Sequence, residues 1–347
     1  MKILAIETSC DETAASVASL TGETITIISN IVASQIDIHQ AFGGVVPEVA
    51  AREHVKQILP TIDQALKQAG LDRQTAKEQL DGIAVTQGPG LLTSLLVGVE
   101  TAKSLALAWQ LPLIPVQHIA GHVSANFINR PLSSFSFPTL TLTVSGGHTA
   151  LILMKDQSSY QIIGQTLDDA AGEAFDKAAS LLKLGYPGGP KISAAAAEFA
   201  KNSSSSDIKL PAPMLRRADY NFSFSGLKTA LLYAIQKDPN WANRVSEYAY
   251  VFEQAVVEAL IRKTIKAASE LRVKSIMLAG GVAANRTLRD KLAKTIEQKL
   301  PGVTFTMPEL IYTTDNAAMI AAAGLINLKN KKTVAPDSII AQPNLSI

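Results

Sequence analysis

The sequence lacks several features that mark whole classes of protein. Its 347 residues include one cysteine, Cys10, so no internal disulfide can form, which is typical of a reducing compartment. Charged residues make up only 18% and apolar residues 47% of the chain, which excludes disorder and allows a sizeable buried core. The net charge of +2 gives no overall basic field, although a locally basic face remains compatible with it.

No segment has the pattern of a membrane span or of an export signal. A span needs about 20 mostly uncharged apolar residues, and the longest apolar stretch, 91–116, contains Glu100, Lys103 and Pro112. The first ten residues hold one lysine and a short apolar run that Glu7 interrupts, unlike a secretion signal. We therefore predict a cytoplasmic protein without a membrane-embedded part.

The order of the predicted elements occurs twice along the chain. Apolar alternation and turn residues predict strands at 2–7, 13–19, 24–33, 82–86 and 113–116, with helices at 47–69 and from 91 to 109. A second series of predicted strands lies at 139–144, 149–154, 160–166 and 275–279. A shift of 136 positions places Ser9 on Ser145 and Thr13 on Thr149. We infer two duplicated α/β lobes with a cleft between them.

The long helices bear on the packing and the bounds of the two lobes. The helix at 47–69 is predicted to be amphipathic, with one apolar side formed by Val49, Val55, Ile58, Leu59 and Ile62. The last helix, 316–328, is expected to pack back on the first lobe. The first lobe would then be discontinuous, with residues 1–130 and 313–347, and the second lobe would span residues 131–312.

Two histidines have the spacing of a metal site. His118 and His122 would lie on one face of a helix, about 5–6 Å apart at Cβ, and two imidazoles there suit a transition metal; two unrelated polar residues at a helix start are the alternative. A zinc peptidase needs a glutamate directly after the first histidine, and Ile119 argues against peptide hydrolysis. Asp315 is the best third ligand, although a helix-capping aspartate fits the same position equally well.

Turns that follow predicted strands supply further candidate residues. Three of them contain glycine, at 88–90, 145–147 and 280–281, and such turns allow N–H groups to surround a phosphate or carboxylate oxygen, which suggests a nucleotide or acyl-phosphate ligand. The acidic pair Asp11-Glu12 is either a base or ligand of metal-bound water, or a solvated turn. Asp176, in the acidic run 167–177, is a candidate for holding ribose hydroxyls.

These motifs together resemble the universal family of tRNA N6-adenosine threonylcarbamoyltransferases. The resemblance covers nearly the whole chain, in the order IETSCDET (6–13), GVVPE (44–48), HxxxH (118–122), VSGGHT (144–149), DDAAGEAFDK (168–177), YPGGP (186–190), FSFSGLKT (222–229), AGGVAAN (279–285) and TDNAAM (314–319). It implies the actin/Hsp70/sugar-kinase fold, which is ribonuclease H-like and agrees with the duplicated lobes.

The resemblance also implies roles for particular residues. His118, His122 and Asp315 would bind one divalent iron or zinc ion. The contacts to threonylcarbamoyl-adenylate would be made by Thr143, Val144, Ser145, Gly146, Gly147, Asp176, Gly189 and Asn285. Many relatives carry an aspartate that contacts the ribose at the position of Ser193, so that contact is in doubt here.

The implied reaction transfers a threonylcarbamoyl group to N6 of the adenosine beside the anticodon, in tRNAs that read codons beginning with A. Asp11 or Glu12 would accept the proton of the amine, and Arg216, Arg217, Lys228, Arg286 and Arg289 are candidate tRNA contacts. The implied partners are a catalytically silent paralogue, which would dimerise through the first lobe, and a small ATPase that would bring Mg and ATP; a homodimer is the other expected assembly. A phosphotransferase acting on a small metabolite is the alternative function, but it leaves the two histidines without a role.

Overall fold

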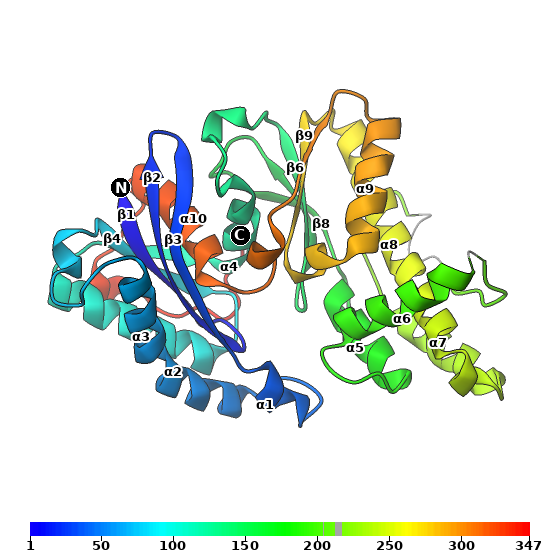
Figure 1. Cartoon of the computed structure of the whole chain (residues 1–347). Coiled ribbons are helices and arrows are strands. Elements are labelled where there is room, and N and C mark those ends of the chain that lie inside the picture. Colours follow the sequence, from blue (N-terminus) through cyan, green and yellow to red (C-terminus); the bar gives the residue numbers. More distant parts are fainter. Residues whose placement is uncertain (204, 212–216) are drawn as a thin grey trace. The chain divides into compact units, whose positions relative to one another are not determined.

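The computed structural model describes residues 1–203, 205–211 and 217–347 (Figure 1). These residues form two compact units. The first unit comprises Met1–Ser136, Asp156–Tyr160 and Pro308–Ile347, and the second comprises Phe137–Lys155 and Gln161–Met307.

The first unit contains a five-stranded mixed sheet. Its strands are β1 (Lys2–Glu7), β2 (Glu12–Thr21), β3 (Thr24–Ser34), β4 (Gly82–Gly88) and β5 (Leu113–Gln117), in the order β3-β2-β1-β4-β5. The first three strands form an antiparallel meander, and β4 and β5 continue the sheet in parallel with β1. β1 is therefore a central strand, and its residues 3–7 are fully buried.

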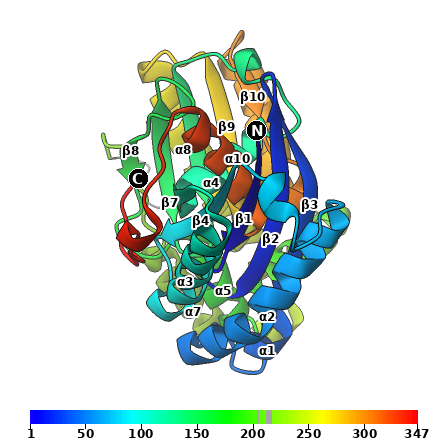
Figure 2. The same ribbon diagram turned by 90° about the vertical axis from the view of Figure 1, so that its left-hand side faces the viewer.

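Helices cover both faces of this sheet. They are α1 (Ile36–Gln40), α2 (Pro47–Gln68), α3 (Leu92–Trp109), α4 (His118–Ser124) and α10 (Ala317–Lys329). The neighbouring helices α2 and α3 pack over one face and share a core with Leu4 and Ile6 of β1 (Figure 2). The other face carries α10, where Gly324 lies so close to Ala84 and Ile3 that a Cβ atom there would be 2.7 Å from the Ala84 side chain. Successive β1 residues thus point to opposite helical layers.

The predicted apolar side of α2 is partly wrong. Ile58 and Ile62 are buried, but Val55 and Leu59 are 64% and 49% exposed. Adjacent residues on a helix are separated by about 100°, so Ile58 and Leu59 cannot share a narrow stripe. The buried face instead includes the polar residue His54, which the apolar pattern could not indicate.

The second unit repeats the sheet topology of the first. Its strands are β6 (Thr139–Val144), β7 (Thr149–Met154), β8 (Gln161–Gln165), β9 (Ser275–Ala279) and β10 (Thr304–Thr306), in the order β10-β9-β6-β7-β8. Strands β6, β7 and β8 form the antiparallel meander, and β9 and β10 are parallel to β6. The predicted duplication of a meander followed by a parallel strand is confirmed.

The helices of the second unit are α5 (Ala171–Leu181), α6 (Gly188–Asn202), α7 (Ser225–Lys237), α8 (Val245–Glu270) and α9 (Arg286–Lys299). Short 3-10 turns complete the two units at Ala76–Glu78, Ala125–Phe127, Leu132–Ser134, Trp241–Asn243, Gly281–Ala284, Leu310–Tyr312 and Pro336–Ser338. The apolar core of the second unit includes Phe175, Phe252 and Leu278.

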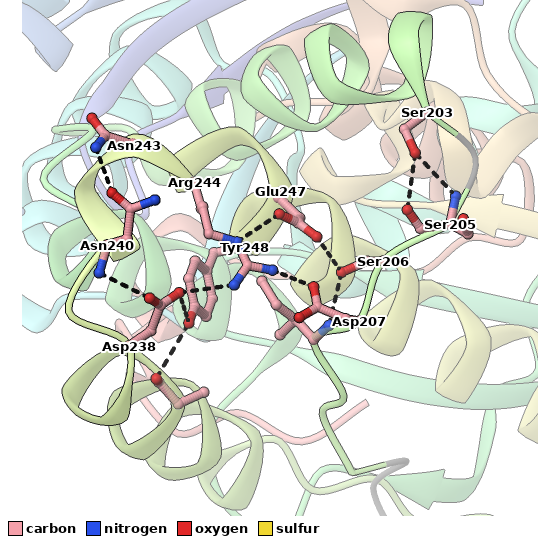
Figure 3. A network of polar contacts seen from close by, with 12 residues as sticks. Ser203, Ser205, Ser206, Asp207, Asp238, Asn240, Asn243, Arg244, Glu247 and Tyr248 are labelled. Atoms are coloured by element: carbon pink, nitrogen blue, oxygen red, sulfur yellow. Dashed lines mark hydrogen bonds and ion pairs between the residues drawn. The ribbon is translucent and has the colours of Figure 1, made fainter.

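A charged network fixes the start of α8. The guanidinium of Arg244 forms ion pairs with Asp207, Asp238 and Glu247 (Figure 3). The Tyr248 hydroxyl donates to the same Asp238 carboxylate at 3.1 Å. The Arg244 side chain therefore joins the segment after α6 to the C-terminal end of α7 and to the first turn of α8. Among the helices of the described residues, none is long and apolar enough to cross a membrane.

Candidate functional site

The two histidines lie on the short helix α4, as predicted. The helix begins directly after β5, and the side chain of Gln117 caps it by accepting the N–H of Ala120 at 2.8 Å. The Nε2 atom of Gln117 also donates to the carbonyl of Leu345 at 3.3 Å, so the C-terminal segment supports the cap. His118 and His122 are almost fully buried, and their ring centroids are 4.7 Å apart.

Asp315 completes a cluster with both histidines. Its Oδ1 lies 3.1 Å from Nε2 of His122 and 3.6 Å from Nε2 of His118. Asn316, rather than Asp315, caps α10, because its Oδ1 accepts the N–H of Met319 at 3.0 Å. The preceding residues form a 3-10 turn at Leu310–Tyr312. The carboxylate of Asp315 is therefore directed to the histidines instead of to the helix terminus.

The geometry of this cluster fits a transition metal. One ligand atom from each of His118, His122 and Asp315 lies within 4.8 Å of the other two. Ligands at 2.0–2.2 Å from a tetrahedral ion are separated by about 3.3–3.6 Å, close to the two measured separations. Within the described part of the chain, neither ring nitrogen of the buried His122 has a hydrogen bond of normal geometry. A bound cation would satisfy such a buried nitrogen.

A second carboxylate, Glu7 at the end of β1, lies behind His118. Its Oε2 is 3.2 Å from Nδ1 of His118, on the opposite side of the ring from Asp315. Burial lowers the pKa of His118, but Asp315 and Glu7 outweigh this effect and raise the pKa to about 9. Burial similarly opposes ionisation of Glu7, but His118 holds the pKa of Glu7 below its usual value. This role of Glu7 was not expected from the sequence, where the available signal was a lone acid directly after the apolar run 3–6.

The acidic turn between β1 and β2 is held by three consecutive carbonyl groups. The Ser9 carbonyl accepts the N–H of Leu91 at 2.8 Å, and the Asp11 carbonyl accepts the N–H of Gln35 at 3.1 Å. The Cys10 carbonyl lies between them and accepts Nε2 of the buried His54 at 2.9 Å. This turn is therefore rigidly attached to α2 and to the starts of α1 and α3.

Asp11 and its neighbour Glu12 differ in burial, because Asp11 is buried and Glu12 is half-buried. Asp11 is 8% exposed. Glu12 is the first residue of β2 rather than part of the turn, and its Oε1 accepts the Ser34 hydroxyl at 2.9 Å. Burial, followed by the charges of Asp11 and Asp315, raises the pKa of Glu12 to about 9. Burial raises the pKa of the Cys10 thiol as well, so the cysteine is not an activated nucleophile.

In the second unit, the glycine turn after β6 has free donors. The N–H of Ser145 is used inside the turn, where it donates to the carbonyl of His148 at 2.7 Å. The N–H groups of the exposed Gly146 and Gly147 donate to no acceptor in the described residues. Gly172, at the start of α5, allows this helix to approach the turn, because its Cβ would be 2.6 Å from the Ser145 carbonyl. The turn and the start of α5 are therefore in direct backbone contact, and the N–H of Gly172 donates to the Ser145 carbonyl at 3.1 Å.

The other two glycine turns allow close backbone contacts. We expected the N–H groups of the first of these turns to face an anion. The N–H of Gly90 instead donates to the carbonyl of Pro343 at 3.2 Å and is not available to a ligand. A Cβ at Gly280 would lie 2.4 Å from the Val144 carbonyl, at a positive φ of +90°. Because β6 and β9 are parallel neighbours, Gly280 and Ser145 follow strand ends at the same edge of the sheet.

Among the remaining predicted substrate contacts, Thr143 and Val144 are fully buried at the end of β6, whereas the other three lie on anchored segments. Asp176 accepts the N–H of Gly188 at 2.7 Å, which places Gly189 beside it at the start of α6. Asn285 caps α9 and donates to Ser193 and, at 2.7 Å, to Glu253.

Glu253 is a residue that the sequence analysis did not single out. It is 2% exposed, and its carboxylate also accepts the hydroxyl groups of Ser193 and Thr287, each at 2.9 Å. Its only signal in the sequence is an acid within the apolar stretch of α8. Ser193 thus contacts this buried acid.

The predicted tRNA contacts are placed only in part. Arg217 pairs with Asp219, and Arg286 pairs with Asp290. Arg289 donates to the Ala283 carbonyl at 2.6 Å, and Lys228 lies half-buried on α7. Arg216 lies outside the described residues.

The duplicated sheets define an α/β protein of the sugar-kinase class, and the buried cluster of His118, His122 and Asp315 adds a candidate metal centre. Solved structures agree with this fold. A full-length HypF in its phosphate- and nucleotide-bound form superposes with a TM-score of 0.60 at 14% identity, over 96% of this chain and 47% of that chain. HypF from T. kodakarensis gives a TM-score of 0.61 at 15% identity, over 95% of this chain and 48% of that chain.

Sequence comparisons define the family. The model of TsaD, tRNA N6-adenosine threonylcarbamoyltransferase, matches residues 26–322. Proteins of that name from Anoxybacillus flavithermus and Bacillus subtilis are 49% and 47% identical, over 99% and 100% of this chain and over 97% and 96% of their own lengths. The protein from Thermosipho africanus is 48% identical over the full length of both chains. The chain belongs to the tRNA N6-adenosine threonylcarbamoyltransferase family, as the resemblance indicated.

Proposed function

We propose that this protein transfers the threonylcarbamoyl group of threonylcarbamoyl-adenylate to N6 of the adenosine that follows the anticodon, in tRNAs that read codons beginning with A. The observation that carries the proposal is the buried cluster of His118, His122 and Asp315 in a chain of this family. A metabolite phosphotransferase would leave these three residues without a role, and the family comparisons do not favour it.

One divalent iron or zinc ion is the cofactor of this proposal, with His118, His122 and Asp315 as its protein ligands. The bound ion would supply positive charge that polarises a carbonyl or neutralises phosphate, an effect worth several kcal/mol. The imidazoles and the carboxylate are suitable donors for either metal.

The residues of the second unit bind and orient the acyl donor in this proposal. They are Thr143, Val144, Ser145, Gly146, Gly147, Asp176, Gly189 and Asn285. The free N–H groups of Gly146 and Gly147 are suited to hold an oxygen that becomes negatively charged, and the loss of one such donor typically slows a reaction by about 10²–10³-fold. The carboxylate of Asp176 is suited to ribose hydroxyls.

The acidic turn handles the proton of the nucleophile. The N6 amine of adenosine is a weak nucleophile because its lone pair is delocalised into the ring, so attack requires an activated acyl group with AMP as the leaving group. The amine loses a proton after the new C–N bond forms, and the pair Asp11 and Glu12 is proposed to accept it. Asp11 is the first candidate, because the raised pKa of Glu12 keeps that carboxyl protonated at neutral pH. The anchored carbonyl groups of Cys10 and Asp11 support this assignment, because a base must be held at a defined position.

The proposed partners are tRNA, a catalytically silent paralogue and a small ATPase that uses Mg and ATP, in the cytoplasm; a homodimer is the assembly proposed without partners. We place the dimer contact on the first unit, at the outer face of α2, where Val55 and Leu59 are exposed. Val55 and Leu59 are four residues apart, so their exposed side chains lie together on α2, and contiguous apolar patches mark protein interfaces.

A reconstituted reaction tests the function. The full-length protein, its partners, threonylcarbamoyl-adenylate and unmodified tRNA are combined, and the nucleosides are analysed by mass spectrometry. We expect threonylcarbamoyladenosine with the wild-type protein; its absence would refute the proposal.

Metal analysis tests the centre separately. We expect about one transition-metal ion per chain, which His118→Ala and Asp315→Ala lose. Asp81→Ala, an exposed aspartate whose carboxylate accepts the N–H of Lys2, is the control that keeps the ion. Full metal content and unimpaired transfer by Asp315→Ala would remove the metal assignment but not the transferase function.

A further inference from the structure

Glu7 is a buried carboxylate that the proposed reaction does not use. It is fully buried at the end of β1. Its Oε1 accepts the backbone N–H of Ser9 at 2.5 Å, and its Oε2 accepts the Thr86 hydroxyl at 2.6 Å. The same Oε2 lies 3.2 Å from Nδ1 of His118. Three groups from separate parts of the first unit therefore converge on one carboxylate.

These contacts determine which ring nitrogen of His118 carries a proton. An ionised carboxylate is only an acceptor, so an Nδ1 lone pair facing Oε2 at 3.2 Å would be repelled. The Ser9 hydroxyl lies 3.1 Å from the same Nδ1 atom, but a hydroxyl group can either donate or accept. The carboxylate therefore sets the direction, because its contact is favourable only when Nδ1 carries hydrogen and donates it to Glu7. An imidazole that binds a metal is neutral and has one N–H, so a proton on Nδ1 leaves the Nε2 lone pair for the ion. That Nε2 atom faces Asp315 at 3.6 Å, on the metal side of the ring.

We propose that Glu7 is the positioning residue of the metal centre, which accepts Nδ1–H of His118 and thereby directs the Nε2 lone pair of His118 to the ion. This inference rests on the metal centre of the proposed function and deepens it. Carboxylates behind metal-binding histidines commonly fix the tautomer and the orientation of the ring.

The isosteric change Glu7→Gln separates this role from simple packing. The backbone N–H of Ser9 is a fixed donor, so the amide oxygen of glutamine must occupy the Oε1 position. The NH₂ group then occupies the Oε2 position, facing Nδ1 of His118. The Thr86 hydroxyl can rotate to accept one of its hydrogens. The other hydrogen is directed at Nδ1, which can accept it only without a proton of its own. The ring proton moves to Nε2, where it blocks the metal. The reverse orientation of the amide is unfavourable, because its NH₂ group and the backbone N–H of Ser9 would be two hydrogen-bond donors facing each other.

A zinc titration of the metal-free, full-length protein tests this inference. Zn²⁺ alone is added in competition with a chromophoric chelator, and we expect Glu7→Gln to bind it about 10–100-fold more weakly than wild type. Glu253→Gln is the matched control, because it changes another buried, hydrogen-bonded glutamate to its amide in the second unit. We expect this control to keep wild-type zinc affinity. Equal zinc affinity of folded Glu7→Gln and wild type would overturn the inference.

A spectroscopic measurement on the wild-type protein does not depend on the folding of a variant. In zinc-loaded protein labelled with ¹⁵N-histidine, His118 should show a hydrogen-bonded Nδ1–H and a metal-bound Nε2. Only five histidines need assignment. A proton on Nε2 of His118, with the metal on Nδ1, would overturn the proposed role of Glu7. Failure of wild-type protein to bind zinc or iron would instead refute the metal centre itself, so the two failures are distinguishable.

Discussion

The substitution Glu12→Gln should stabilise the metal-free protein at neutral pH. In the folded state, burial and the charges of Asp11 and Asp315 raise the pKa of Glu12 from 4.5 to about 9. The folded state therefore binds this proton more tightly than the unfolded state does. The contribution of Glu12 to stability is complete below pH 4.5 and is lost as the pH rises toward 9. Glutamine keeps the oxygen that accepts the Ser34 hydroxyl but carries no charge.

The magnitude follows from the separation of the two pKa values. One pKa unit corresponds to about 1.4 kcal/mol. The pKa of Glu12 in the unfolded chain is 4.5, so pH 7 lies about 2.5 units above it, while pH 7 is still below the folded-state pKa of about 9. Wild type should thus lose about 3 kcal/mol between pH 4 and pH 7, relative to Glu12→Gln. The corresponding difference in melting temperature is about 4–8 °C, the upper value applying if the first unit unfolds alone.

Thermal unfolding followed by circular dichroism, after removal of metal by a chelator, measures this difference. The melting temperature of Glu12→Gln should exceed that of wild type at pH 7 and approach it at pH 5. Glu23→Gln, which changes an exposed glutamate of the same unit, is the control and should give one small difference at both pH values. A Glu12→Gln difference that is the same at pH 5 and pH 7 would show that Glu12 titrates normally in the folded protein.

Three further predictions concern the second unit. Gly280→Ala should lower stability by more than about 2 kcal/mol, because its Cβ would be 2.4 Å from the Val144 carbonyl at a positive φ; an unchanged melting temperature would contradict this. Phe252→Ala, at a fully buried position, should cost about 3–5 kcal/mol in urea unfolding, and a cost below about 1 kcal/mol would argue against the described core. Tyr248→Phe removes a hydroxyl that donates to Asp238 at 3.1 Å and should cost about 1 kcal/mol in the same assay; a neutral or stabilising effect would refute that hydrogen bond.

Local patterns explain the parts of the fold that the sequence predicts well. Strands β1, β6, β7 and β9 have the predicted bounds, because their apolar runs end at polar or glycine turns. The spacing of His118 and His122 is equally local, since one helical turn brings two side chains to the same face. The face of α2 was predicted less well, because a broad set of apolar residues does not reveal which of them a neighbouring element covers.

The duplicated order of elements and the histidine pair can be read from the sequence alone, because both depend on residues close together in the chain. The three-dimensional fold is needed to see that Asp315 faces this pair instead of capping α10, and that Glu7 lies behind His118. These contacts join residues more than 100 positions apart. They arise because β1, β4 and β5 are neighbours in one sheet and α10 packs on that sheet, which no local pattern specifies.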